Sequence, residues 1–268
     1  MKRLKTGLAL SGGVAKSVAH IGVLRALVEQ KIDIDYLAGT SGGALVASFF
    51  AAGKSVAELE ALGSGMHWQN LAGITVPRLG FLSSEKVRKF IADEIGDVEF
   101  RDLKIPVAIV ASDLTAGARR VFTTGKVALA CQASSAVPEF YTPVEIDGHL
   151  FIDGGLSEYV PVEALASLGD MYRIGVNLGF ERGTKKKPRN LIEVTFEVTN
   201  YISQQNASIS ERHADFMIRP DLGAFGPFDL DRASDMMRAG YLSTMRVIPE
   251  LKAALLALDA DSATEDTI

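Results

Sequence analysis

The chain has 268 residues and a formal net charge of −5 at pH 7; 47% of its residues are hydrophobic and 23% are charged. This composition is typical of a globular protein and excludes a chain that is disordered throughout. The acidic balance lacks the basic excess that nucleic-acid binding requires, so we expect no nucleic-acid partner. Cys131 is the only cysteine, which excludes an internal disulfide and a cysteine-based metal site and indicates a reducing compartment.

No apolar stretch approaches the roughly 18 residues of a transmembrane helix. The basic start MKRLK is followed only by GLAL before the first glycines, too short for the core of a signal peptide. We therefore expect a soluble cytoplasmic protein. Peripheral contact with the inner membrane and the oligomeric state stay open.

The first fifty residues predict two parallel strands, each followed by a helix. The expected elements are a strand at 6–13, a helix at 16–31, a strand at 34–43 and a helix at 44–53. Five apolar residues of the first helix recur at helical spacing, namely Val18, Ile21, Leu24, Leu27 and Val28. This order implies right-handed crossovers between parallel strands.

The rest of the chain shows no internal repeat and no linker, so we expect one domain over residues 1–258. Its segments are a helical and loop region at 55–96, a buried strand at 104–113, a hairpin at 144–152, strands at 171–179 and 214–220, and a basic loop at 181–190. An Asp-Gly pair between two alternating runs predicts the hairpin. The small polar end, 259–268, predicts a disordered tail.

The motif GTSGG at residues 39–43 fits G-x-S-x-G, the pattern of a nucleophile elbow. It lies between an apolar strand and an apolar helix, as such an elbow requires. Gly39 and Gly43 would let the backbone turn sharply and lift the Ser41 hydroxyl to the helix N-terminus, where free amides stabilise negative charge. A plain glycine-rich turn is the alternative.

A serine nucleophile needs a base, and the four histidines offer no compelling one. His20 lies in an apolar helix, His67 in a polar loop, His149 beside the hairpin turn and His213 at a strand entry. A Ser-His-Asp triad stays open without support.

Carboxylates are better placed than the histidines. Asp147 is explained by its hairpin turn, whereas Asp153 ends a strand and is followed by two glycines that no hairpin of this length requires. Asp113 also ends a strand, at the sheet edge where open α/β sheets collect functional groups. For Asp113 we favour a role in holding a loop over a role in catalysis.

Three stretches of the chain, in this order, resemble the patatin-like phospholipases. They are GLALSGGVAKSVAHIGVL, IDYLAGTSGGALVASFFAAG and ASSAVPEFYTPVEIDGHLFIDGGL, and the resemblance covers about residues 7–165, with ASDLTAG in between. It implies a three-layer α/β/α fold with a mostly parallel sheet. It also implies cleavage of lipid acyl esters by a Ser-Asp dyad that needs no histidine, cofactor or metal.

Carried over by this resemblance, Ser41 matches the nucleophile. Asp153 matches the base, in a D-G-G motif completed by Gly154 and Gly155. An unperturbed carboxylate, with a pKa near 3.9, is a poor base for a hydroxyl, so it needs a short hydrogen bond and a dry site.

The stretch SGGVAKS matches the family's oxyanion loop, usually G-G-G-x-[RK]-G. Gly12 and Gly13 match, Lys16 fills the basic position, and Val14 and Ser17 stand in place of glycines. We expect backbone amides around Gly12, Gly13 and Val14 to hold the oxyanion. Valine disfavours a positive φ, so a left-handed turn at Val14 would be strained.

Two other functions stay open. A non-catalytic or weakly active relative is suggested by Val14, Ser17 and Glu158, the last of which stands where an asparagine is common. A nucleotide-binding protein is suggested because SGGVAKS is similar to a deviant Walker-A loop, although Ser11 and Ala15 depart from that motif.

Three further segments are candidates for contact with a lipid substrate. Residues 55–96 and 224–230 would line or cover an apolar groove, with ordinary helix packing as the alternative. The basic run KKKPR at 185–189 would meet anionic head groups, with a solvated surface loop as the alternative.

Overall fold

The computed structural model describes residues 4–66, 73–74, 82–179, 187–188 and 191–265. His67, Trp68 and all but two residues of the predicted basic loop lie outside these ranges.

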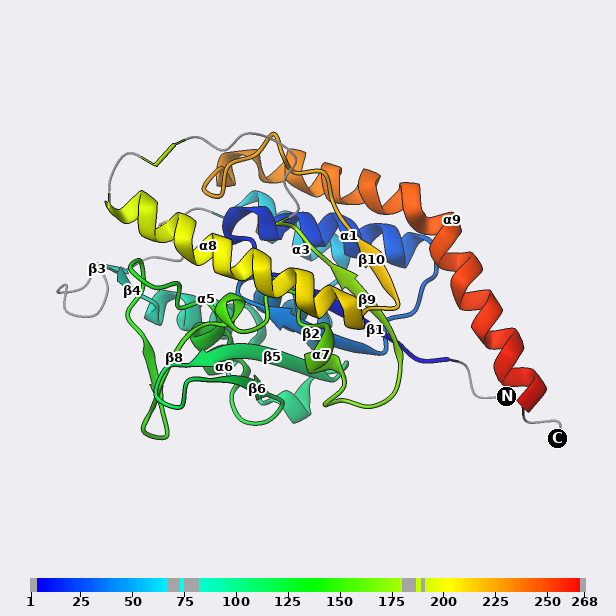
Figure 1. The fold of residues 1–268 in the computed structure, drawn as a ribbon, viewed down its shortest axis with the longest axis horizontal. Coiled ribbons are helices and arrows are strands. Elements are labelled where there is room, and N and C mark those ends of the chain that lie inside the picture. The colour runs from blue at the N-terminus through cyan, green and yellow to red at the C-terminus, as the bar shows by residue number, and fades with distance from the viewer. Residues whose placement is uncertain (1–3, 67–72, 75–81, 180–186, 189–190, 266–268) are drawn as a thin grey trace.

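The fold is built on an eight-stranded, mostly parallel sheet (Figure 1). Its strands are β1 (Thr6–Leu10), β2 (Tyr36–Thr40), β5 (Val107–Asp113), β6 (Ala118–Phe122), β7 (Val144–Ile146), β8 (His149–Asp153), β9 (Tyr172–Val176) and β10 (Phe216–Ile218). The order is β10-β9-β1-β2-β5-β8-β7, and β6 pairs with β5. The first five strands of this order are parallel, whereas β6, β7 and β8 join through antiparallel pairs.

Helices cover both faces of the sheet. The described α-helices are α1 (Ala19–Glu29), α2 (Gly42–Ala52), α3 (Val56–Ser64), α5 (Glu85–Ile95), α6 (Val127–Ser134), α7 (Val162–Leu165), α8 (Leu191–Ser210) and α9 (Ala233–Glu265). The short pair β3 (Gly73–Ile74) and β4 (Leu82–Ser83) lies apart from the main sheet. Figure 1 shows α9 running beside α1, and α8 crossing the opposite side of the sheet.

Alternate residues of the central strands enter two different cores. Leu8 and Leu10 of β1 pack in a large core with α1, α2 and α9, whereas Ala9 packs in a smaller core with α7 and Ala207 of α8. Side chains of a strand alternate between the faces of a sheet, so a parallel strand covered on both faces is apolar throughout. The predicted three-layer α/β/α fold is confirmed.

The local predictions hold for most elements. Of the five apolar residues at helical spacing, Val28 is 46% exposed, because it lies at the edge of the apolar stripe near the end of α1. The strand β6 was not predicted, because its residues ARRVF are charged and exposed at the start and lack an apolar alternation. The helix α9 continues to Glu265, through most of the segment for which the sequence predicts a disordered tail.

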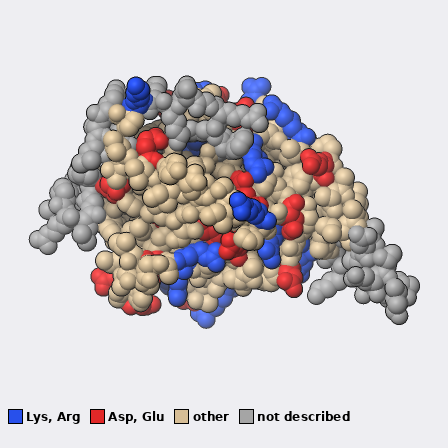
Figure 2. All heavy atoms as spheres, in the orientation of Figure 1, with Lys and Arg blue, Asp and Glu red and all other residues tan. Residues whose placement is uncertain are grey.

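The exposed surface of α8 carries several large apolar side chains. Its exposed large apolar side chains are Val194, Val198, Tyr201, Ile202 and Ile209. Figure 2 shows few charged side chains over the middle of this face, where α8 runs in Figure 1. Within the described part of the chain, no helix combines the length and the apolar character needed to cross a membrane.

Candidate active site

Ser41 occupies a strained turn between β2 and α2. Its backbone has φ 53° and ψ −126°, a conformation that costs energy for any residue except glycine. Gly39 and Gly43 do not themselves take a positive φ. They leave space instead: a Cβ at Gly39 would overlap Ala44, and a Cβ at Gly43 would overlap the carbonyl of Leu10. The elbow is therefore formed by Ser41, and the glycines allow helix and strand to pack closely around it.

The pairing register of β5 brings Ser41 and Asp153 together. β2 pairs with β5 up to Thr40, opposite Val110, and β8 approaches from the other direction and ends at Asp153, opposite Ala111. Because β6 covers the other edge of β5 along this stretch, β2 and β8 must share one edge and meet end to end. The residue after Thr40 therefore lies beside the Asp153 carboxyl.

The carboxyl of Asp153 is buried and only partly satisfied. Its Oδ1 accepts a hydrogen bond of 2.8 Å from the Gly155 amide, and its Oδ2 has no hydrogen-bond partner of standard geometry among the described residues. Burial raises the pKa of Asp153 to about 6, against smaller lowering effects of the Ser41 hydroxyl and the Gly155 amide. A carboxylate of this pKa is a much stronger base than an exposed one.

Ser134 holds the backbone of Ser41 in place. Its Oγ accepts a hydrogen bond of 2.8 Å from the Ser41 amide and donates one of 2.6 Å to the carbonyl of Val110. This fully buried side chain therefore ties the elbow to β5. No local pattern predicts this role of Ser134; the only local signal is its place in ASSAVPEF, at the end of α6.

The oxyanion loop forms a short 3₁₀ helix, Val14–Val18, that leads into α1. The Gly12 amide donates to the carbonyl of Tyr159 at 3.1 Å, so it is not free to hold an oxyanion. Of the three predicted donors, Gly13 and Val14 remain, and their amides form no backbone hydrogen bond with the described residues. The Gly12 amide is therefore already engaged by Tyr159, unlike those of the other two expected donors.

Val14 adopts the left-handed conformation, with φ 52°. A valine in this region is strained by about 1–2 kcal/mol relative to glycine. We expect Val14→Gly to change the free energy of unfolding by no more than about 1 kcal/mol, because relief of strain offsets the lost packing and the extra flexibility of glycine. Val18 has an ordinary φ of −61° and is buried, so Val18→Gly should cost about 3 kcal/mol. Urea unfolding of both variants measures the difference, and equal losses would show that Val14 is unstrained.

Two other positions of the family motifs have defined places. Lys16 is buried and lines the cavity that contains Asp153. Glu158 is buried and caps α7: its carboxylate accepts hydrogen bonds from the amides of Glu163 and Ala164 and forms an ion pair of 2.7 Å with Arg119. The Glu158 carboxylate thus binds the first turn of α7 and holds Arg119 of β6. Burial raises the pKa of Glu158.

The described histidines do not line the cavities around Ser41. His149 pairs with Asp113 at 2.8 Å, and His213 pairs with Glu163 at 3.1 Å. Asp113 also accepts the amide of Ala116, so it holds its loop, as we had favoured. Burial alone would raise the pKa of Asp113, but these hydrogen bonds lower it overall.

His20 lies beneath the oxyanion loop. It is fully buried, and its Nε2 lies 2.8 Å from the carbonyl oxygen of Ser11, to which the neutral ring can donate. Burial lowers the pKa of His20 to about 4, although the bond to Ser11 opposes this. The ring is therefore neutral at pH 7 and supports the start of the loop.

The lowered pKa of His20 predicts that the stability of the fold decreases in acid. The His20 ring gains a proton near pH 6.5 in the unfolded chain but only near pH 4 in the folded chain. The contribution of the neutral ring to the free energy of unfolding is therefore complete above pH 6.5 and is lost as the pH falls to 4. The free energy of unfolding falls by about 3 kcal/mol over this pH range. We expect His20→Gln to lack this part of the pH dependence in urea unfolding at pH 4–7. An unchanged pH dependence would contradict the assignment to His20.

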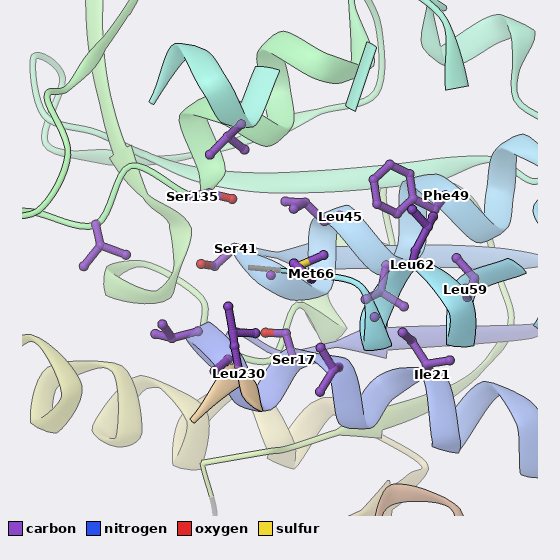
Figure 3. A pocket seen from close by; sticks show the side chains of 18 of the residues that line it. Ser17, Ile21, Ser41, Leu45, Phe49, Leu59, Leu62, Met66, Ser135 and Leu230 are labelled. Atoms are coloured by element: carbon purple, nitrogen blue, oxygen red, sulfur yellow. The ribbon is translucent and has the colours of Figure 1, made fainter. Parts of the chain in front are cut away.

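Ser41 lies where two cavities meet. An apolar cavity of about 820 Å³ extends from Ser41 between α1, α2 and α3 (Figure 3), and a polar cavity of about 1620 Å³ extends below α8; both volumes include space open to solvent. Val14, Ser41 and Val137 line both cavities, whereas Asp153 lines the polar one. An ester bound at Ser41 can thus place its two halves in different surroundings.

Both segments predicted to line a groove do so within their described parts. Leu59 and Leu62 of α3 and Val87 of α5 line the apolar cavity. Residues 223–227 and Asp229 line the polar cavity, and Leu230 lines the apolar one. The segment also contacts the oxyanion loop, because the Ala15 amide donates to the carbonyl of Pro227 at 3.1 Å.

Comparisons with known proteins point to one family. The family model of the patatin-like phospholipases matches residues 8–166. An uncharacterised NTE family protein of Mycobacterium bovis is 37% identical over 189 residues, which cover 67% of this chain and 51% of that protein. The neuropathy target esterase sws of Drosophila melanogaster is 30% identical over 188 residues, covering 66% of this chain and 13% of that protein. The chain thus spans about half the length of the mycobacterial relative and a small part of the fly protein.

A solved structure is similar in fold. VipD from Legionella pneumophila aligns with a TM-score of 0.61 at 15% identity, covering 93% of this chain and 67% of that one. Because the family model covers more than half of the residues, including the elbow, the loop and Asp153, this chain belongs to the patatin-like phospholipase family.

Proposed function

We propose that this chain is a serine acyl hydrolase that cleaves acyl esters of lipids with Ser41 and Asp153 as its dyad. The observation that carries the proposal is the buried Asp153 carboxyl, whose Oδ2 is unsatisfied and whose pKa is about 6, beside a serine on a strained elbow. Strain and perturbed pKa values concentrate at functional sites.

The reaction proceeds through an acyl-enzyme. Ser41 Oγ forms a bond to the acyl carbonyl carbon, its proton passes to Asp153, and the carbonyl electron pair moves onto oxygen. The amides of Gly13 and Val14 stabilise that oxyanion. Collapse expels the alcohol, which takes the proton from Asp153. A water activated by Asp153 then releases the acid and regenerates Ser41.

The two cavities orient the substrate. An acyl chain gains free energy by leaving water, so it occupies the apolar cavity between α1, α2 and α3. The alcohol, which carries the head group of a lipid, occupies the polar cavity with Lys16, Glu197 and Asp229. Peripheral membrane contact stays a prediction, and the exposed apolar side chains of α8 are the surface on which to test it.

A weakly active or non-catalytic relative is the second candidate. It is favoured by the strain at Val14 and by the engagement of the Gly12 amide. We do not favour the nucleotide-binding function, because the amides of Gly12 and Ala15 already donate to backbone carbonyls and cannot cradle a phosphate.

Two measurements test the proposal together. The purified chain is assayed with nitrophenyl esters of increasing acyl length and with phospholipids, and is treated with a fluorophosphonate. We expect ester hydrolysis, and a peptide containing Ser41 that gains the phosphonyl mass. Labelling without hydrolysis would support the non-catalytic relative, and absence of both would overturn the proposal.

A further inference from the structure

The hydroxyl of Ser17 is buried without a partner. Ser17 is 5% exposed, and its Oγ forms no hydrogen bond with any described residue. Buried hydroxyls in proteins are nearly always hydrogen-bonded, so an unpartnered one indicates an atom that the site has yet to receive.

This hydroxyl lies between the oxyanion loop and the nucleophile elbow. A Cβ built on Gly42, the residue after the nucleophile, would overlap Ser17 Oγ, and a Cβ built on Gly13 would come within 3.2 Å of it. Ser17 also lines the apolar cavity together with Ser41. Figure 3 shows Ser17 and Ser41 at the same end of that cavity, with Phe49 and Leu59 at the other.

The Ser17 hydroxyl would add a third donor to the two amides that remain in the oxyanion loop. Oxyanion holes commonly combine two or more donors, from backbone amides or from hydroxyl and amide side chains. The Gly12 amide is bound to Tyr159 and cannot serve. Gly13 and Val14 remain, and the Ser17 hydroxyl is adjacent to Gly13 on the same loop.

We propose that Ser17 is a catalytic residue of the oxyanion hole, and that its Oγ–H donates a hydrogen bond to the acyl oxygen as that oxygen becomes negative. The inference rests on the proposed function. The donated proton stays on Ser17: the charge arises when Ser41 Oγ bonds to the carbonyl carbon and the π electron pair moves onto oxygen. The position usually holds a glycine in the oxyanion loop of the family, so this donor belongs to the present chain.

The test compares Ser17→Ala, Ser17→Thr and the wild type with one hydrolysed ester. Loss of one uncharged oxyanion donor should lower kcat about 10²- to 10³-fold in Ser17→Ala and leave KM within about twofold. The rate of fluorophosphonate labelling should fall in parallel, because the phosphonyl oxygen also develops charge. The melting temperature should not fall, because a buried hydroxyl without a hydrogen-bond partner destabilises the folded state and alanine removes it.

Two further variants separate catalysis from packing. Ser17→Thr keeps the hydroxyl and should recover most of the lost kcat. Ser208→Ala, at an exposed site on α8 where the hydroxyl binds the carbonyl of Gln205, should match the wild type.

Each remaining outcome is decisive. A kcat for Ser17→Ala within about threefold of the wild type in an active enzyme overturns the role of Ser17 and leaves the proposed function intact. A loss of kcat that Ser17→Ala shares with a lowered melting temperature, and that Ser17→Thr does not recover, also overturns it. A wild type that neither hydrolyses esters nor reacts with the phosphonate overturns the proposed function and the inference with it.

Discussion

Replacement of Ser41 by alanine is expected to lower kcat at least about 10⁴-fold, because the covalent route through the acyl-enzyme is lost and only binding and the oxyanion donors remain. Fluorophosphonate labelling should disappear from the peptide that contains residue 41. The fold should persist, because alanine keeps the Cβ and the Ser41 amide still donates to Ser134. Stopped assays with concentrated enzyme and intact-protein mass spectrometry measure both effects.

The matched control for Ser41→Ala is Ser208→Ala, which removes a hydroxyl from the exposed face of α8. Its kcat and labelling should equal those of the wild type. More than about 1% residual activity in Ser41→Ala, after contamination is excluded, would place the nucleophile elsewhere.

Asp153→Asn should lower kcat about 10³- to 10⁴-fold, because the amide is nearly isosteric with the carboxyl but cannot take the Ser41 proton. Its side-chain oxygen can still accept the hydrogen bond from Gly155, so the strand end should keep its shape. In the wild type, kcat/KM should rise with pH through about 6 and level off above pH 7, as Asp153 loses its proton.

The same variant should be more stable at neutral pH. The folded-state pKa of about 6 lies above the reference value of 3.8, so the folded chain holds this proton more tightly than the unfolded chain. The resulting stabilisation is complete below about pH 4 and is lost as the pH rises through 6. At pH 7 the buried charge costs about 3 kcal/mol, which Asp153→Asn should recover in urea unfolding. Full activity in this variant would remove Asp153 from the mechanism; unchanged stability would show that its carboxylate is well solvated.

Asp153 and His20 act in opposite directions on acid stability. As the pH falls from 6.5 to 4, His20 destabilises the fold and Asp153 stabilises it, each by about 3 kcal/mol. The wild type should therefore show a shallow pH dependence from these two groups, and the variants His20→Gln and Asp153→Asn should show slopes of opposite sign.

Much of the fold and of the candidate site is readable from local sequence. Apolar runs that end in glycine turns predicted β1, β2, β5, the β7–β8 hairpin and the helix after Ser41, because burial on both faces of a parallel sheet leaves little tolerance for polar residues. GTSGG and FIDGG marked Ser41 and Asp153 because close backbone packing at an elbow or strand end requires glycine. These signals arise from residues that are neighbours in the chain, so they can be recognised in a single sequence.

Other features depend on segments that meet only in the folded chain. The pairing of β8 with the edge of β5 beyond β2 brings Asp153 to Ser41, and no local pattern encodes that register. The use of the Gly12 amide by Tyr159, the support of Ser41 by Ser134 and the burial of the unpartnered Ser17 hydroxyl arise in the same way. The composition and motifs of the chain specified its layers and its candidate reacting groups. Hydrogen-bond partners, pKa values and cavities followed from long-range packing, because each is a property of the surroundings that several distant segments create together.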